Sequence, residues 1–156
     1  CFVPCHGCID NAIHSAAGLQ LREECAEIMR AQGHPEPAGR AKLTGGYNLP
    51  AQYVLHTVGP IVGRWVTWKD RRELTACYRA CLELAAEHGL RTVAFCCIST
   101  GEFHFPNQEA AEIAVHTVRD FLDQRTTSIE RVIFNVFKDL DKDIYRRLLG
   151  PDRTAA

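Results

Sequence analysis

The chain has 156 residues, a length that fits one domain and argues against two. Its formal net charge of −1 provides no general attraction to nucleic acid, so we expect no nucleic-acid partner. No apolar run reaches the roughly 18 residues that a transmembrane helix needs, and no charged segment followed by an apolar stretch opens the chain. We therefore expect neither a membrane segment nor a signal peptide.

The eight cysteines lie on different kinds of segment, which favours buried free thiols over a disulfide framework. Cys77 and Cys81 share a helical pattern, whereas Cys96 and Cys97 are adjacent in an apolar run. Unpaired thiols are typical of a reducing compartment, so the sequence predicts a cytoplasmic location.

The chain opens with CFVPCHGCIDNAIH, in which three cysteines and a histidine fall within eight residues. Thiolates and neutral imidazoles are preferred ligands of zinc. Cys1, His6 and Cys8 have a comfortable spacing for one tetrahedral ion, and Cys5 is then spare. Three protein ligands would leave a fourth position open for catalysis, but spacing alone favours this equally with a structural site or plain loop cysteines.

A helix is expected from Asp10 to about Arg30, with Asp10 near its N-cap and with Gly33 and Pro35 as the stop. An N-cap alone is the more common role for an acid at that place. Strands are expected near 41–44 and 52–58, followed by a helix from Lys69 to His88.

The run RTVAFCCI, residues 91–98, predicts a central strand buried on both faces. It leads into STGEFHF, whose hydroxyls and backbone N–H groups could cradle a phosphate, although an ordinary βα turn is the commoner explanation. A helix should start near Pro106, RVIFNVF should form another buried strand, and DKDIYRRLL a terminal helix. Phe103, Phe105 and Phe137 could line a nucleobase, but such residues usually pack in the core.

The alternation of buried strands and helices predicts an α/β fold, a three-layer α/β/α sandwich with a parallel or mixed sheet. Ligands of such sheets bind beyond the carboxyl ends of the strands, where STGEFHF lies.

Four stretches in order resemble a macrodomain over nearly the whole chain. They are CHGCIDNAIHSAAG, AKLTGGYNLPAQYVLHTVGP, AFCCISTGEFHFPNQEAAEIAV and VIFNVFKDLDKDIYRRLL. Cysteine and histidine in place of the usual glycines are similar to the zinc-dependent members, microbial protein-ADP-ribose hydrolases. The resemblance implies a macrodomain-like mixed sheet over residues 1–150 and a tail over 151–156. Strands and helices that normally precede this point, with an adenine-recognising acid and a VNAAN-like stretch, are absent from the sequence, so we expect the N-terminal strands to be lacking.

The resemblance also implies a zinc-dependent hydrolase that removes mono-ADP-ribose from protein side chains. Cys1, His6 and Cys8 match the zinc ligands, and Asp10 with Asn11 matches the catalytic acid and its neighbour beside the distal ribose. The implied ADP-ribose contacts are Ile9, Asp10, Asn11, Ser99, Thr100, Gly101, Glu102, Phe103 and Phe137. A lipoyl-carrier-like protein is the implied modified partner, and the chain is expected to be a monomer. The alternatives are a macrodomain that binds ADP-ribose without hydrolysing it, or a structural zinc protein without a nucleotide.

Overall fold

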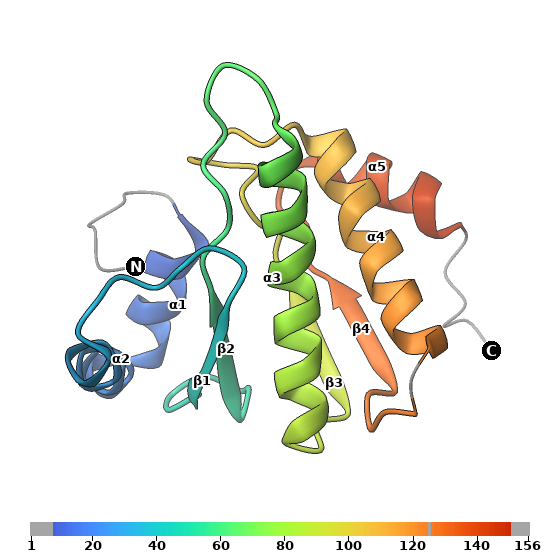
Figure 1. Cartoon of the computed structure of the whole chain (residues 1–156). Coiled ribbons are helices and arrows are strands. Elements are labelled where there is room, and N and C mark those ends of the chain that lie inside the picture. The colour runs from blue at the N-terminus through green and yellow to red at the C-terminus, as the bar shows by residue number, and fades with distance from the viewer. Residues whose placement is uncertain (1–7, 125, 151–156) are drawn as a thin grey trace.

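The computed structural model describes residues 8–124 and 126–150. Within these ranges five helices and four strands follow one another along the chain (Figure 1). They are α1 (Ile9–Ala17), α2 (Leu19–Gln32), β1 (Ala41–Gly45), β2 (Tyr53–Thr57), α3 (Trp68–Glu87), β3 (Thr92–Phe95), α4 (Asn107–Gln124), β4 (Arg131–Phe134) and α5 (Asp139–Leu149). Most of these elements lie within a few residues of the positions that the sequence predicts.

The first helical region is two helices, so the prediction of one helix from Asp10 to Arg30 was wrong. Gly18 separates α1 from α2 with φ 93° and ψ −179°, a conformation that is almost confined to glycine. Apolar periodicity continues through such a break, because both helices bury residues against the same neighbours. The expected stop at Gly33 is confirmed, since Gly33 adopts the left-handed conformation at the end of α2.

The strands form one antiparallel and one parallel pair, which makes the strand pairing mixed. β1 pairs with β2 in the register Ala41 to Thr57, and β3 pairs in parallel with β4 in the register Thr92 to Arg131. Among residues 8–124 and 126–150 no hydrogen-bonded ladder joins β2 to β3. The carboxyl ends of β2, β3 and β4 point toward the same end of the molecule, at the top of Figure 1.

Helices cover both faces of the antiparallel pair. Val54 packs against buried residues of α1 and α2, whereas Leu55 packs against the larger core that includes α3. Neighbouring residues of a strand point to opposite faces, so β1 and β2 are sandwiched between α2 and α3, as Figure 1 shows. The α/β class and its layered arrangement are thus confirmed.

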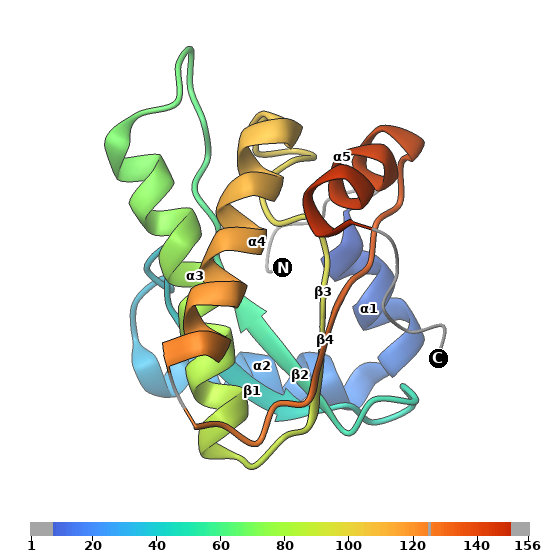
Figure 2. The ribbon, with the colours of Figure 1, turned by 90° about the vertical axis from the view of Figure 1, so that its right-hand side faces the viewer.

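The larger core lies between α3, α4, α5 and the parallel pair (Figure 2). Tyr78, Phe105 and Phe121 are the largest side chains buried in it. The expectation that residues 91–98 and 131–137 form strands buried on both faces was wrong. Both strands are shorter, and their outward residues, such as Ala94 and its partner Ile133, are exposed. Apolar runs do not reveal whether a second layer of helices covers them.

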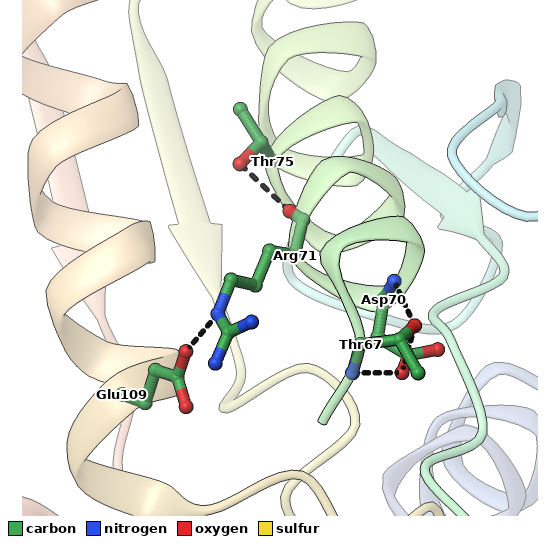
Figure 3. A network of polar contacts seen from close by, with 5 residues as sticks. All are labelled: Thr67, Asp70, Arg71, Thr75 and Glu109. Carbon is green, nitrogen blue, oxygen red and sulfur yellow. Dashed lines mark hydrogen bonds and ion pairs between the residues drawn. The ribbon is translucent and has the colours of Figure 1, made fainter. Parts of the chain in front are cut away.

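Polar contacts hold the start of α3 and link it to α4 (Figure 3). Thr67 caps α3: its hydroxyl accepts a hydrogen bond from the Asp70 N–H at 3.2 Å, and its own N–H donates to the Asp70 carboxylate at 2.7 Å. Hydrogen bonds from Thr67 also lower the pKa of Asp70. One turn later Arg71 forms an ion pair with Glu109 in the first turn of α4. These contacts fix the two helix starts that flank the loop after β3.

None of the helices in the described part of the chain is both long and apolar enough to cross a lipid bilayer.

Candidate functional site

The start of α1 brings Cys8 and Asp10 into the first turn of one helix. Cys8 is the N-cap, and its sulfur accepts a hydrogen bond from the Asn11 N–H at 3.4 Å. Asp10 therefore lies inside the first turn and is not the cap that the sequence predicts. Negative charge is favoured at this end of a helix, which suits both a thiolate and a carboxylate.

Asp10 faces a histidine one turn further along α1. His14 Nε2 lies 3.8 Å from an Asp10 carboxylate oxygen, and about one third of the Asp10 side chain is exposed. Burial lowers the pKa of His14, while the nearby Asp10 opposes this effect. The imidazole is therefore neutral near pH 7, and the Asp10 carboxylate is partly buried, with its Oδ2 shielded from solvent.

The loop after β3, residues 96–106, is tightly folded around Ser99. Ser99 has φ 64° and His104 has φ 56°, both in the left-handed region that non-glycine residues rarely adopt. The Phe105 N–H donates to the Ser99 carbonyl at 2.9 Å, and the Thr100 hydroxyl donates to the Cys97 carbonyl at 3.0 Å. Strained backbone that persists in this way is common at ligand sites.

Several donors of this loop have no acceptor among the described residues. The N–H groups of Gly101, Glu102 and Phe103 donate to none of them, and the buried Ser99 hydroxyl has no hydrogen-bond partner there. Successive free N–H groups in a turn form a typical cradle for phosphate oxygens. The loop is therefore not fully hydrogen-bonded within the described residues, and phosphate binding at STGEFHF stays a prediction.

A second loop, residues 58–67, supports the first from the end of β2. The Val62 N–H donates to the Phe103 carbonyl at 2.9 Å. A Cβ on Gly59 would lie 2.1 Å from Ser99 Oγ, so only glycine allows this approach. The sequence did not reveal this contact, because nothing local links residues 59 and 99.

The predicted site residues are placed in three groups. Ile9, Asp10 and Asn11 lie at the start of α1, and Ser99, Thr100, Gly101, Glu102 and Phe103 lie in the loop after β3. Phe137 follows β4 and is 98% exposed, while Phe105 is buried in the core and cannot line a nucleobase.

Some predicted residues lie outside the described part of the chain, namely Cys1, Cys5, His6 and the expected tail 151–156. The groups at α1 and after β3 lie toward the same end of the molecule in both views (Figures 1 and 2).

Comparison with known proteins identifies the family. The family model described as Macro domain matches residues 1–114. The chain belongs to the Macro domain family. It is 54% identical over 150 residues to a protein-ADP-ribose hydrolase of Treponema medium, an alignment that covers 96% of this chain and 57% of that protein. A protein-ADP-ribose hydrolase of Staphylococcus aureus (strain Mu50) is also 54% identical, over 97% of this chain and 57% of the relative.

A solved structure extends the similarity to three dimensions. The Oceanobacillus iheyensis macrodomain with ADP superposes with a TM-score of 0.83 at 37% identity, covering 92% of this chain and 75% of that one. The fold is therefore the macrodomain fold. This chain spans 57% of the length of the two hydrolases that it matches.

Proposed function

We propose that this macrodomain is a zinc-dependent protein-ADP-ribosyl hydrolase that removes mono-ADP-ribose from modified protein side chains. The loop after β3 carries the proposal: the N–H groups of Gly101, Glu102 and Phe103 have no acceptor among the described residues. A diphosphate would supply acceptors for them. The relatives that match nearly the whole chain bear the name protein-ADP-ribose hydrolase, which supports the same reaction.

Asp10 is the residue of the described chain best placed for proton transfer at the distal ribose. It lies in the first turn of α1 with about one third of its side chain exposed, beside a neutral His14. In the reaction, water adds across the bond that joins ADP-ribose to the protein, and free ADP-ribose and the unmodified side chain leave. Asp10 orients the attacking water or takes its proton, and Asn11 lies next to it at the start of the helix.

The chemistry of Cys8 fits a zinc ligand. Its sulfur is the N-cap of α1 and accepts the Asn11 N–H, at the end of the helix where the predicted catalytic residues lie. Cys1 and His6 would be the other two ligands, with Cys5 spare. When bound there, zinc supplies Lewis acidity to a distal-ribose hydroxyl or to water.

The substitution Asp10→Asn tests the hydrolase assignment. We expect ADP-ribose release from a mono-ADP-ribosylated protein to fall at least about 100-fold, with ADP-ribose affinity changed only a few-fold. Asp123→Asn, at an exposed acid in the last turn of α4, is the matched control and should leave both unchanged. If the unsubstituted chain binds ADP-ribose tightly but releases none from the modified protein, it is a binding module instead.

The substitution Cys8→Ala tests the metal. A catalytic zinc predicts that release is lost while the circular dichroism spectrum and the unfolding temperature stay near those of the unsubstituted chain. A structural zinc protein without a nucleotide ligand predicts that Cys8→Ala unfolds the chain and that neither form binds ADP-ribose.

We also propose that the modified partner is a lipoyl-carrier-like protein and that the chain acts as a monomer in the cytoplasm. Release from a modified lipoyl-carrier domain should exceed release from an unrelated modified protein at equal concentration. Equal rates would contradict selectivity for the carrier.

A further inference from the structure

Three side chains that commonly bind metal ions meet between α1, α2 and β2. They are His14, Cys25 and His56, and one donor atom from each lies within 4.8 Å of the other two. Cys25 Sγ is 3.8 Å from His56 Nε2, and the centroids of the two imidazole rings are 6.2 Å apart. Because these residues are 11 and 31 positions apart, the cluster exists only in the folded chain.

The alternation of β2 and the helical spacing of α2 explain how the cluster forms. His56 points to the same face of β2 as Val54, which packs on the small core of Ala17, Leu21 and Cys25. Cys25 follows Leu21 by one helical turn, so both face this strand. His14 precedes Ala17 by three residues, so the two share a side of α1. The cluster is therefore held by three packed elements and does not depend on a loop.

The donor set and the spacing suit zinc. One thiolate and two imidazoles are a common zinc ligand set, and a tetrahedral ion with ordinary Zn–S and Zn–N bonds separates sulfur and nitrogen by about 3.6 Å. The 3.8 Å between Cys25 and His56 is close to that value. The donor atoms of all three residues lie within 4.8 Å of one another, so metal binding would draw them together by about 1 Å.

Zinc binds cysteine as a thiolate and histidine as a neutral imidazole. Binding at this cluster would therefore release the proton of the Cys25 thiol to solvent.

Hydrogen bonding within the cluster leaves one ring nitrogen without a partner among the described residues. His56 Nε2 is 2.8 Å from the buried Thr44 hydroxyl, which accounts for that nitrogen in the metal-free chain. His14 Nδ1 is buried and has no hydrogen-bond partner among the described residues. A buried polar atom without a partner lowers the stability of the fold, and a metal ion bound by His14 would offset this cost.

We propose that His14, Cys25 and His56 form a second metal site, suited to Zn²⁺ and separate from the proposed Cys1, His6 and Cys8 set. The ion would join α1 to α2 and β2, and so fix the helix that carries Asp10. Its existence does not depend on whether the chain hydrolyses ADP-ribose.

Cobalt(II) tests the site because a thiolate ligand gives the bound ion a near-ultraviolet charge-transfer band. A chain with Cys1→Ala, Cys5→Ala and Cys8→Ala lacks every thiol of the first proposed metal set. Freed of metal with a chelator and then titrated, this triple variant should bind one equivalent of cobalt through Cys25 and show the band. Adding Cys25→Ser should abolish the band, whereas adding Cys81→Ser, at a buried thiol of the other core, should keep it. A triple variant without the band, or one whose band survives Cys25→Ser, would overturn the proposal.

A second measurement covers the case in which Cys25→Ser does not fold. In the same triple variant, one equivalent of zinc should move the imidazole nitrogen resonances of His14 and His56. The exposed His116 on α4, paired with Asp120 at 3.1 Å, serves as the internal control and should not move. Unchanged resonances of His14 and His56 would equally rule the site out.

Discussion

Gly59 shows how one residue can decide whether two loops touch. Because Gly59 has no side chain, the loop after β2 can approach Ser99 and Ile98. A Cβ added at Gly59 would lie 2.1 Å from Ser99 Oγ and 2.8 Å from an Ile98 methyl carbon. Ile98 is buried, so it cannot swing away without disturbing the core. The shape of the loop after β3 thus depends on a residue forty positions earlier.

Gly59→Ala should therefore weaken both stability and ligand binding. We expect a loss of about 1–3 kcal/mol in the free energy of unfolding, as is usual when a methyl group is forced into packed surroundings, together with weaker ADP-ribose binding. Urea unfolding and calorimetric titration measure the two effects. Gly63→Ala in the same loop is the control, because a Cβ there meets nothing within 4 Å. Equal behaviour of the two variants would contradict this account.

The sequence alone predicted the positions of some residues of the candidate site. The places of Asp10 and Ser99 follow from a helix start and from a polar loop after an apolar strand. The Gly59 contact and the cluster of His14, Cys25 and His56 could not be predicted in this way, because they depend on side chains from separate elements that meet only after folding.

At the scale of elements, the break between α1 and α2 is the feature that periodicity missed. Gly18 adopts φ 93° with ψ −179°, and a Cβ there would lie 2.7 Å from Asn48 Nδ2. Helical patterns report which residues are buried, and they continue through a break when both helices pack on the same core. Backbone conformation at one glycine is not visible in such a pattern.

Gly18→Ala should accordingly lower the free energy of unfolding by more than Gly33→Ala, which changes the glycine at the C-terminal end of α2. We expect a loss of about 2–3 kcal/mol in the free energy of unfolding, from backbone strain and the approach to Asn48. Gly33→Ala, with φ 74° and no atom within 4 Å of the added Cβ, should cost only about 1 kcal/mol. Chemical denaturation of both variants gives the comparison, and a smaller loss at Gly18 than at Gly33 would contradict the role of the break.

The capping box of α3 gives a second prediction at this scale. Thr67→Ala removes the hydroxyl that accepts the Asp70 N–H, so the free energy of unfolding should fall by about 1 kcal/mol. Thr75→Ala is the control on the same helix, since the Thr75 hydroxyl only donates to the Arg71 carbonyl at 2.9 Å and caps nothing. Thermal unfolding of the two variants should separate them, and equal unfolding temperatures would mean that the cap contributes little (Figure 3).

At the scale of the whole molecule, the fold class and the order of the elements were predictable from the sequence. Whether helices cover both faces of β3 and β4 was not. Alternating strands and helices predict an α/β fold, which the structure confirms. The exposed outer face of β3 and β4, with Ala94 and Ile133, depends on which elements reach it, and strand sequences do not contain that information.

The proposed activity also belongs to this scale, because it joins the start of α1 to the loops after β2 and β3. One ligand has to meet three parts of the molecule. These are the N–H groups proposed to bind phosphate, the Asp10 carboxylate on α1 and the proposed zinc beside it. Substitutions probe these parts singly, whereas turnover requires all of them together.

The most direct test is the rate at which the unsubstituted chain releases ADP-ribose from a mono-ADP-ribosylated protein with zinc, after chelation, and after zinc is restored. We predict release with zinc, loss of release after chelation with the circular dichroism spectrum retained, and recovery when zinc returns. Release that continues unchanged in chelator would contradict the zinc dependence. Tight binding of ADP-ribose with no release under any of the three conditions would contradict the hydrolase itself.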